Sequence, residues 1–426
     1  MWWRPWWLGC PAMPAAPTDR FSSPAADAFA AASAWRRTVS RGPTWSRWRR
    51  RWRTCPGGRI RVPTTRSRRW STNCARAARS RDTTASPRHA MSIQTLSPFL
   101  VPAALAWMLL AVIWLMALER TAKAKWMHRL HALLPAGVML VALFGPAGSA
   151  AAQLSLQWLV AGAMMLAWLT AVWLLSLVTR NAGSMDVAYS LTASLTAVGL
   201  ALVDGHYSTR QLVFLLLVVI WSARLVAHAS STNLGQSQEQ QPYASWRKNN
   251  GKRWWWWSYF QVFLLQGGLI WIWALPMVMT IHAEPGPLTR LDMLAIAIWL
   301  TGFVFQAGAD RQLKRFKADP GNKGKVLQSG LWSLTRHPNY FGEATMWWAY
   351  FVFGLAHPLG WIAIVGPLYV TWFMSKGSAA AMLDRHMLRT KPDYAAYVER
   401  VPGFFPGFKS SADARMLERF RSRQRS

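Results

Sequence analysis

The chain has 426 residues, of which 52% are hydrophobic and 15% charged, and its formal net charge is +32. A charge of this size would suit a nucleic-acid-binding protein, whose basic surface releases counterions from phosphates. The apolar residues, however, come in runs of about 20, the length that a helix needs to cross a bilayer. An ordinary soluble domain is therefore excluded, and no nucleic-acid partner is expected.

Residues 1–90 differ in composition from the rest. They contain no Lys and no Glu, and they hold about half of the excess positive charge. Segments such as 45–52 (WSRWRRRW) have neither helical nor strand periodicity, so nothing in them predicts a packed core. We expect a disordered Arg/Trp-rich leader. Three interpretations stay open: translation that starts at Met91, a targeting segment, and an arm that binds the membrane surface.

The cysteines are confined to this leader. They are Cys10, Cys55 and Cys74. The remaining chain therefore offers no thiol to a disulfide, a metal ion or a nucleophilic mechanism.

Hydropathy predicts seven membrane-spanning helices from residue 91 onward. They cover residues 99–118, 133–150, 158–178, 187–203, 212–228, 259–281 and 294–309. A further apolar region, 345–374, is interrupted at His357-Pro358-Leu359-Gly360, so we expect two short helices in a hairpin that crosses or re-enters the membrane. The predicted fold is an all-α polytopic membrane protein with about seven to nine membrane helices.

The basic residues alternate between the loops as the positive-inside rule requires. The loops after the first, fifth and seventh spans are basic, whereas 145–157 carries no charge. This pattern predicts an N-terminus outside and a C-terminus in the cytoplasm, in the cell inner (plasma) membrane. We expect residues 91–409 to form one multi-span domain and residues 410–426 a charged, flexible tail.

The densest group of polar residues lies at 306–343, on the predicted cytoplasmic side. Asp310, Lys314 and Lys317 are four and three residues apart, so they can share one helix face. Several glycines in the segment allow tight turns of the kind that phosphate-binding loops use. Lys and Arg could neutralise a pyrophosphate, and Asn and Glu could bind a ribose or a nicotinamide amide. The composition equally allows a loop whose charge sets topology and binds anionic membrane lipids.

The order of residues in this segment resembles the C-terminal signature of the steroid 5-alpha-reductase superfamily, in particular its uncharacterised bacterial branch. The resemblance rests on Asp310-Arg311-Gln312-Leu313, Gly330-Leu331-Trp332, Thr335-Arg336-His337-Pro338-Asn339-Tyr340-Phe341-Gly342-Glu343, Pro392-Asp393-Tyr394 and Phe405-Pro406. It covers residues 306–406 most specifically and, by the order of the spans, residues 91–406.

The resemblance implies an NADPH site that faces the cytoplasm. It also implies reduction of a carbon-carbon double bond, conjugated to a carbonyl, in a steroid-like or other lipid-soluble substrate. Asn339 and Glu343 would contact the nicotinamide end. The full set of cofactor-binding residues that it implies is Gln306, Asp310, Lys314, Lys317, Asn322, Lys325, Arg336, His337, Asn339, Tyr340 and Glu343.

Such a reduction also needs a group that polarises the carbonyl and supplies a proton. In the better-known steroid reductases a Glu and Tyr pair in the N-terminal half does this, and the sequence alone does not identify its equivalent. The candidates are Tyr340, Asp186, Tyr189, Arg224 and Tyr259. Each has a plainer interpretation as an interfacial anchor or a helix-helix hydrogen bond. The segment 238–243 (QEQQPY) departs from the charged cluster of many bacterial relatives and keeps only Glu239 and Tyr243 of that character.

Two other classes of function stay open. A loosely similar His-Pro-Asn-Tyr loop occurs in S-adenosylmethionine-dependent membrane methyltransferases that modify isoprenylcysteine or phospholipids, although the extra basic residues here favour a cofactor with more phosphates. A non-enzymatic transporter or scaffold is the third possibility, but no internal repeat supports a transporter.

No metal site is expected, because His337 and Glu343 are six residues apart and lack the spacing of a helical metal motif. The sequence names neither the substrate nor the oligomeric state.

Overall fold

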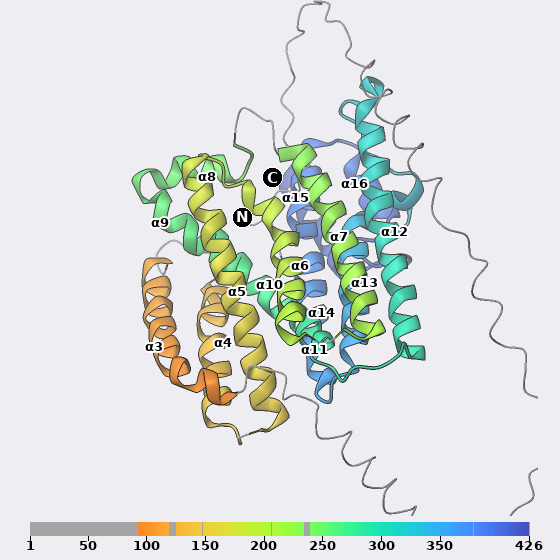
Figure 1. Ribbon diagram of the computed structural model, residues 1–426. Helices are drawn as coiled ribbons and strands as arrows, with labels where there is room; N and C mark the ends of the chain where they lie inside the picture. Colours follow the sequence, from red (N-terminus) through yellow and green to blue (C-terminus); the bar gives the residue numbers. More distant parts are fainter. Residues whose placement is uncertain are drawn as a thin grey trace, which may run out of the picture. The chain divides into compact units, whose positions relative to one another are not determined.

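The computed structural model describes residues 93–118, 125–146, 148–205, 207–233, 239–377 and 379–425. The expected leader with its three cysteines, and Met91, lie outside these ranges. Within the ranges the secondary structure is helical and contains no strand (Figure 1). The predicted all-α class is confirmed.

Five long helices form the first part of the described chain, and each packs against the next. They are α3 (Ile93–Leu118), α4 (Lys125–Phe144), α5 (Ala150–Val178), α6 (Ser184–Asp204) and α7 (Thr209–Asn233). These five helices and α12 (Arg290–Ala318) are long and apolar enough to cross a membrane. A seventh candidate is a bent pair, Tyr243–Trp273 and Leu275–Ile281, whose axes differ by 49°. Each of the seven overlaps a predicted span, and the chain is a multi-pass membrane protein.

The bent span is assembled from short pieces: α8 (Tyr243–Asn250), η2 (Gly251–Arg253), α9 (Trp254–Ser258), the π-helical η3 (Tyr259–Leu264), α10 (Leu265–Trp273) and α11 (Leu275–Ile281). The bend falls just before Pro276 in the first turn of α11, because proline has no N–H to continue the preceding helix. The run of four tryptophans at residues 254–257 contains both buried and exposed side chains. Trp254 and Trp257 are buried in the core, whereas Trp255 is exposed and suits the headgroup region of a membrane.

Helix α12 is longer than the hydrocarbon core of a bilayer is thick. Its 29 residues extend about 43 Å, against a hydrocarbon core of about 30 Å. The helix begins with a capping box between Thr289 and Asp292, and Arg210 of α7 donates to both carboxylate oxygens of Asp292 at 3.0 Å. No charged residue lies between Asp292 and Asp310, and from Asp310 onward the last turns of α12 form a polar extension beyond the apolar part.

The predicted hairpin is present. Helix α13 (Pro338–Gly354) is followed by η6 (Gly360–Ile364), α14 (Val365–Trp372) and the π-helical η7 (Phe373–Gly377). The turn between them contains the His357-Pro358-Leu359-Gly360 interruption. Two short turns, η4 (Pro320–Asn322) and η5 (Gly330–Ser333), connect α12 to α13.

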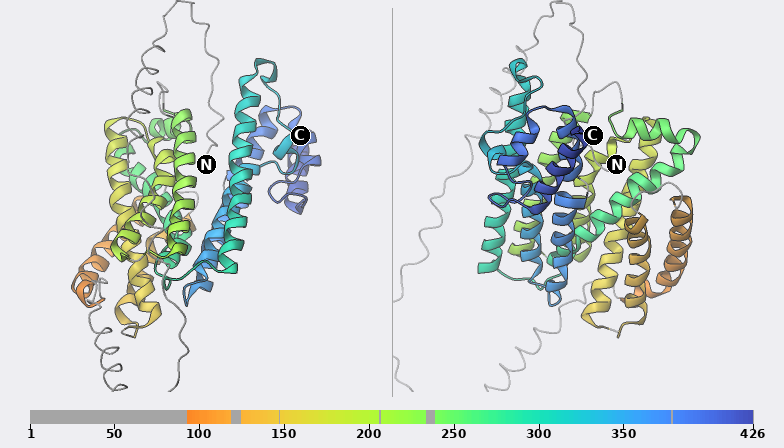
Figure 2. Two further views of the ribbon diagram at one scale, coloured as in Figure 1. Left: turned by 45° about the vertical axis from the view of Figure 1, so that its right-hand side comes forward. Right: turned by 180° about the vertical axis from the view of Figure 1, so that it is seen from behind.

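The last three helices form a small separate core beside the polar end of α12, as both views of Figure 2 show. They are α15 (Ala379–Thr390), α16 (Tyr394–Arg400) and α17 (Ser411–Arg425). Leu417 of α17 is buried in this core with Tyr397 of α16. The segment expected to be a flexible tail therefore differs from the expectation: its amphipathic pattern lets it fold as a helix against α16.

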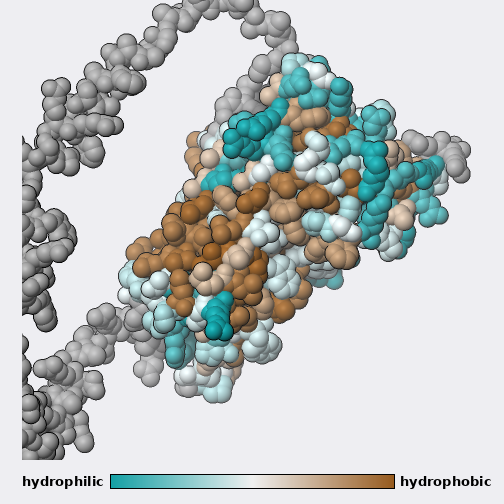
Figure 3. Space-filling view, turned by 90° about the vertical axis from the view of Figure 1, so that its right-hand side faces the viewer, coloured by the Kyte–Doolittle hydropathy of each residue, from teal (hydrophilic) through white to brown (hydrophobic). Residues whose placement is uncertain are grey.

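Hydrophobic residues gather in a broad band across the face shown in Figure 3, and hydrophilic residues gather at both ends of that band. Large apolar side chains such as Phe99, Leu105 and Met116 of α3 are more than two thirds exposed, at 68%, 68% and 72%. Apolar exposure on this scale is costly in water and ordinary in lipid.

Candidate functional site

Glu343 lies at the centre of the bundle, where four helices meet, and is only 4% exposed. Its Oε1 atom accepts hydrogen bonds from the Tyr189 hydroxyl at 3.1 Å and from Trp347 Nε1 at 2.9 Å. Its Oε2 atom accepts from Trp221 Nε1 at 2.9 Å and from the side-chain amide of Gln306. A carboxylate offers about four acceptor positions, and all of them are used. We call these five residues the Glu343 network.

A close contact between two glycines brings the network together. Gly302 of α12 and Gly342 of α13 face each other so tightly that a Cβ on Gly342 would lie 2.4 Å from the Gly302 carbonyl oxygen and 2.5 Å from the Gln306 backbone nitrogen. Small residues allow two helix backbones to approach in this way. The contact positions Gln306 against Glu343, which follows Gly342 directly.

A second group of polar side chains, the Asp310 network, lies one helical turn beyond Gln306. The Oδ2 atom of Asp310 accepts from Arg224 Nη2 of α7 at 2.5 Å, and Oδ1 accepts from Asn339 Nδ2 at 3.1 Å. His228, one turn after Arg224, has its Nε2 atom 3.8 Å from Oδ2. The charged Arg224 thus has a carboxylate partner, as a buried charge in a membrane helix requires.

The two networks are joined, and two polar atoms at the junction are unsatisfied. Arg224 Nη2 lies 3.5 Å from the backbone oxygen of Gln306. Within the described residues, Gln306 Oε1 and Arg224 Nη1 are buried and have no hydrogen-bond partner. One is an acceptor and the other a donor, and leaving such atoms unpaired costs about 1–3 kcal/mol each. A carboxamide, which both donates and accepts, has the chemistry to satisfy them.

Arg336 and His337 point away from these networks toward the C-terminal helices. Arg336 Nη2 donates to Asp384 of α15 at 2.8 Å and to Asp413 of α17 at 2.6 Å, and Nη1 donates to the Val401 oxygen at 2.6 Å. His337 Nε2 lies 2.8 Å from the other Asp384 oxygen. We call these residues, with Tyr394, the Asp384 cluster. The Asp384 cluster links the residues just before α13 to the C-terminal core through hydrogen bonds and ion pairs.

The charges in this cluster shift one another's ionisation. Burial opposes ionisation of Asp384, but His337 and Arg336 outweigh it and hold the pKa of Asp384 below its usual range. Burial also opposes the charge on Arg336, and Asp384 outweighs it, so the pKa of Arg336 lies above its ordinary value. Burial and then the neighbouring carboxylate of Asp384 raise the pKa of Tyr394, whose hydroxyl donates to Asp384 at 2.5 Å. Asp384 and Arg336 are therefore both charged at neutral pH.

The remaining predicted cofactor residues lie on the polar extension of α12 and the turn after it. Lys314, Lys317 and Lys325 are exposed. Asn322 supports the turn, because its Nδ2 atom donates to the Phe316 oxygen at 3.0 Å and to Asp319 at 3.2 Å. Tyr340 is half-buried and stacks on the His337 ring with centroids 5.6 Å apart. All three lysines are exposed, and Lys314 and Lys317 follow Asp310 by about one and two turns on α12.

The other candidate proton donors lie at two separate positions, one beside the Glu343 network and one at the contact between η3 and α5. Asp186 lies three residues before Tyr189 on α6, and the Tyr243 hydroxyl donates to it at 2.7 Å. Two pairs of a tyrosine and a carboxylate, Tyr189 with Glu343 and Tyr243 with Asp186, therefore neighbour each other. Tyr259 instead shares a hydrogen bond of 3.0 Å with Thr170 of α5.

The sequence did not point to Trp221, Trp347, Asp384 or Asp413. A signal existed for two of them, because Trp347 is one turn after Glu343 and Trp221 is three residues before Arg224. In an apolar helix, however, tryptophan is typical of an interfacial anchor. In the part of the chain that the structure describes, no group of three or more His, Cys, Asp or Glu could hold a metal ion.

The fold and the site define a multi-pass helical membrane protein with a buried, fully hydrogen-bonded carboxylate at the meeting point of four helices. Residues 172–401, more than half of the chain, match the family model DUF1295, described as a protein of unknown function. The chain belongs to this steroid 5-alpha-reductase-like family, and the resemblance seen in the sequence is confirmed.

Curated relatives include two fungal sterol reductases. The chain is 31% identical over 133 residues to the Delta(14)-sterol reductase erg24 of Schizosaccharomyces pombe, a match that covers 26% of this chain and 31% of that protein. It is 30% identical over 107 residues to erg24A of Aspergillus fumigatus, also a Delta(14)-sterol reductase, covering 21% and 22%. An uncharacterized S. pombe protein, C594.04c, is 22% identical over 273 residues, covering 56% and 77%. The chain thus spans less than a third of the length of these two sterol reductases.

Proposed function

We propose that the protein is an integral membrane oxidoreductase that uses NADPH to reduce a carbon-carbon double bond, conjugated to a carbonyl, in a steroid-like or other lipid. Membership of a steroid 5-alpha-reductase-like family and partial similarity to named sterol reductases support a reductase acting on lipids. The observation that carries the finer proposal is the pair of unsatisfied buried atoms, Gln306 Oε1 and Arg224 Nη1, at the junction of the two networks.

These two atoms fit the carboxamide of a nicotinamide ring, which donates through its nitrogen and accepts through its oxygen. In the proposed complex Gln306, Arg224 and Asn339 hold the nicotinamide end, and Glu343 fixes the amide of Gln306. In this proposal the exposed Lys314, Lys317 and Lys325 supply positive charge for the phosphates. The bound cofactor would supply the hydride. The residues of the chain would orient the cofactor and donate a proton to the substrate.

Arg336 and His337 take a different part in this proposal from the one their motif implies. Their side chains are bonded within the Asp384 cluster. We propose that they act as positioning residues, which hold the first turn of α13 so that Asn339 and Glu343 face the cofactor.

Tyr189 is the proposed proton donor. Its hydroxyl bonds to Glu343, the same carboxylate that holds Gln306, so it lies beside the proposed nicotinamide end. A tyrosine paired with a glutamate is also the arrangement that the family resemblance implies, although here the two residues come from opposite ends of the domain. A positioned donor of this kind contributes about 10²–10⁴-fold to rate.

Titration of detergent-purified protein with NADPH and with S-adenosylmethionine tests the cofactor. We expect saturable binding of NADPH and weaker binding to an Arg224→Leu variant. Saturable binding of S-adenosylmethionine alone would replace the reductase by the methyltransferase interpretation. Binding of neither, together with unchanged lipids in cells that lack the gene, would leave a transporter or scaffold.

We also propose that the protein lies in the inner membrane with this site facing the cytoplasm, where NADPH is available. The absence of cysteine from residues 91–426 allows a direct test. With Cys10, Cys55 and Cys74 replaced by serine, a single cysteine is introduced by Ser329→Cys or by Glu284→Cys, both at exposed positions. A membrane-impermeant maleimide should label Glu284→Cys in intact spheroplasts and Ser329→Cys only after permeabilisation. The reverse pattern would invert the proposed orientation.

A further inference from the structure

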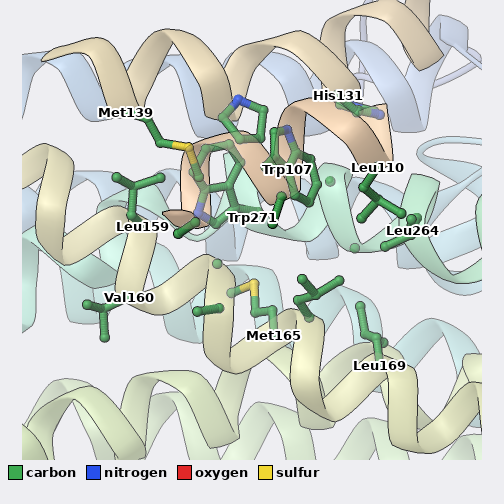
Figure 4. A pocket seen from close by; sticks show the side chains of 18 of the residues that line it. Trp107, Leu110, His131, Met139, Leu159, Val160, Met165, Leu169, Leu264 and Trp271 are labelled. Atoms are coloured by element: carbon green, nitrogen blue, oxygen red, sulfur yellow. The ribbon is translucent and has the colours of Figure 1, made fainter. Parts of the chain in front are cut away.

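A cavity of about 440 Å³ lies away from the Glu343 network, among α3, α4, α5 and α10. Its walls come mainly from residues 99–169, which precede the segment that matches the family model, and otherwise from Leu264 at the end of η3 and residues 267–271 of α10. Figure 4 shows His131 and Met139 toward opposite ends of the cavity, with Trp107 and Trp271 between them. Nothing in the proposed reductase mechanism uses it.

Along most of its length α3 packs against a single neighbour, and this leaves the cavity open beside it. Helix α3 contacts α4 extensively and η3 slightly. The glycine pair at the start of α10 lets side chains of the cavity wall lie directly against the α10 backbone, because a Cβ on Gly267 would lie 2.6 Å from Leu169 and one on Gly268 would lie 2.8 Å from the His131 ring. The volume falls within the range of about 300–1,000 Å³ of small-molecule sites.

The described walls are apolar, and their indole N–H groups are satisfied. Trp107 Nε1 donates to the Ala132 oxygen at 2.8 Å, Trp114 Nε1 to His128 at 3.1 Å, and Trp271 Nε1 to the Trp158 oxygen at 2.7 Å. None of the described side chains that line the cavity is Asp, Glu, Lys or Arg. A charged lipid headgroup would therefore find no counter-ion inside, whereas an uncharged body can be buried at a gain of about 25 cal/mol per Å².

One polar atom in the described walls remains unsatisfied. His131 is 3% exposed, and its Nδ1 atom has no hydrogen-bond partner among the described residues. Its Nε2 atom lies 3.1 Å from the Tyr369 hydroxyl. If Tyr369 donates, Nδ1 carries the hydrogen and needs an acceptor; if Tyr369 accepts, Nδ1 is itself an acceptor and needs a donor. A hydroxyl group meets either requirement.

The position of His131 agrees with such a ligand. Lys125 and Arg129 are exposed at the start of α4 and place that end at a membrane interface. His131 is about 9 Å along the helix from Lys125, and Met139 is about 12 Å deeper. A lipid with its hydroxyl at His131 and its apolar body toward Met139 would have the orientation that an amphiphile takes in a bilayer.

We infer that this cavity is a binding site for an uncharged lipid alcohol, such as a polycyclic alcohol, whose hydroxyl bonds to His131. This site is separate from the proposed NADPH site and does not depend on the reductase proposal.

Photolabelling of the full chain in nanodiscs with a diazirine analogue of cholestanol tests the inference. We expect saturable labelling of peptides from residues 99–114 and 156–169. Cholestanol should compete about tenfold better than cholestane, which lacks the hydroxyl, because an unpaired buried polar atom costs about one power of ten or more in binding. His131→Leu should remove that difference.

Two variants that fill the cavity provide a check on location. Ala106→Trp of α3 and Ala163→Trp of α5 both line it and should abolish saturable labelling. The matched control is Leu109→Trp on the exposed face of α3, which is 64% exposed and should leave labelling unchanged. Size-exclusion profiles identify any variant that fails to fold, and His131→Leu then carries the test.

Three outcomes would overturn the inference. Equal competition by cholestanol and cholestane would remove the role of His131. Better competition by oleate would make the occupant an acyl chain. Labelling spread evenly over the outer face of α3, and unchanged by both filling variants, would mean that the probe reports ordinary surrounding lipid.

Discussion

The α12–α13 contact and the α3–α5 region are both built from apolar helices, yet they pack in opposite ways. At the first, facing glycines let the backbones touch, and a buried carboxylate has all its acceptor positions filled. At the second, a cavity of about 440 Å³ separates the helices, and one histidine nitrogen is unsatisfied within the described residues.

The difference follows from what each region must hold. Polar groups in a membrane are costly unless they are bonded, so the helices around Glu343 must fit closely and keep fixed positions. An apolar cavity carries no such requirement, since lipid can fill it. We therefore expect substitutions near Glu343 to have large effects on activity or folding, and those around the cavity to affect lipid binding.

The largest effect is expected from Tyr189→Phe. If Tyr189 is the proton donor, the variant should lose about 10²–10⁴-fold in kcat toward a lipid enone. Its dissociation constant for NADPH should change by less than about threefold, because Gln306 still bonds to Glu343. Steady-state NADPH oxidation and fluorescence titration measure the two quantities.

The neighbouring pair supplies the matched control. Tyr243→Phe removes the other hydroxyl that is bonded to a carboxylate, at Asp186. If it lowers kcat as much as Tyr189→Phe, or if only Tyr243→Phe does, the proton donor has been assigned to the wrong pair. A loss of NADPH binding in Tyr189→Phe would indicate a structural role instead.

The next largest effect is expected in the Asp384 cluster, which links α13 to the C-terminal core. Asp384→Asn leaves the buried Arg336 and His337 without their shared carboxylate, a change that costs about 3–5 kcal/mol in other buried ion pairs. The melting temperature of the detergent-solubilised protein should fall, and α15–α17 should become sensitive to protease. Asp393→Asn, at an exposed aspartate nearby, is the control and should melt like the wild type.

The same cluster gives a dependence on pH with a definite sign. The pKa of Asp384 in the folded protein lies below its usual value, so the ionised carboxylate stabilises the fold at every pH above its unfolded value of about 3.9. This contribution is lost as the pH falls from there through the folded-state pKa. Thermal melts between pH 5 and pH 2 should show a steeper acid loss in the wild type than in Asp384→Asn, because the loss begins at about pH 3.9 and continues below it. Parallel curves would contradict the assignment.

The sequence predicted these regions unequally. Runs of apolar residues located all seven candidate spans, and the His357-Pro358 interruption located the hairpin, because length and hydropathy are local properties. Motif order placed Gln306, Asp310, Asn339 and Glu343 in one site. It could not show that Arg336 and His337 turn toward Asp384, 47 residues from His337, because that pairing depends on how the C-terminal helices fold back.

An intermediate effect is expected at the glycine contact. In Gly302→Ala the new methyl would lie 2.7 Å from the Gly342 oxygen and 2.8 Å from Met346, so α12 and α13 must separate. Overpacking of this kind costs about 1–3 kcal/mol, and the shift of Gln306 should weaken NADPH binding. The control is Gly137→Ala in α4, which has nothing within 4 Å and should be neutral or slightly stabilising. Equal behaviour of the two variants would mean that the contact does not position the site.

The smallest effect is expected at the surface of the C-terminal core, where Arg421 of α17 pairs with Glu399 of α16. Their side chains are 54% and 45% exposed, and water screens such a pair to about 0–1 kcal/mol. Glu399→Gln should therefore shift the melting temperature only marginally, and the shift should vanish in high salt. Asp413→Asn, on the same helix, removes a half-buried partner of the buried Arg336 and should cost more and keep most of its effect in salt. If Glu399→Gln and Asp413→Asn lower the melting temperature equally and depend equally on salt, the ion pair between Arg336 and Asp413 adds no more stability than the surface pair. The apolar face of α17 alone would then hold this helix in place.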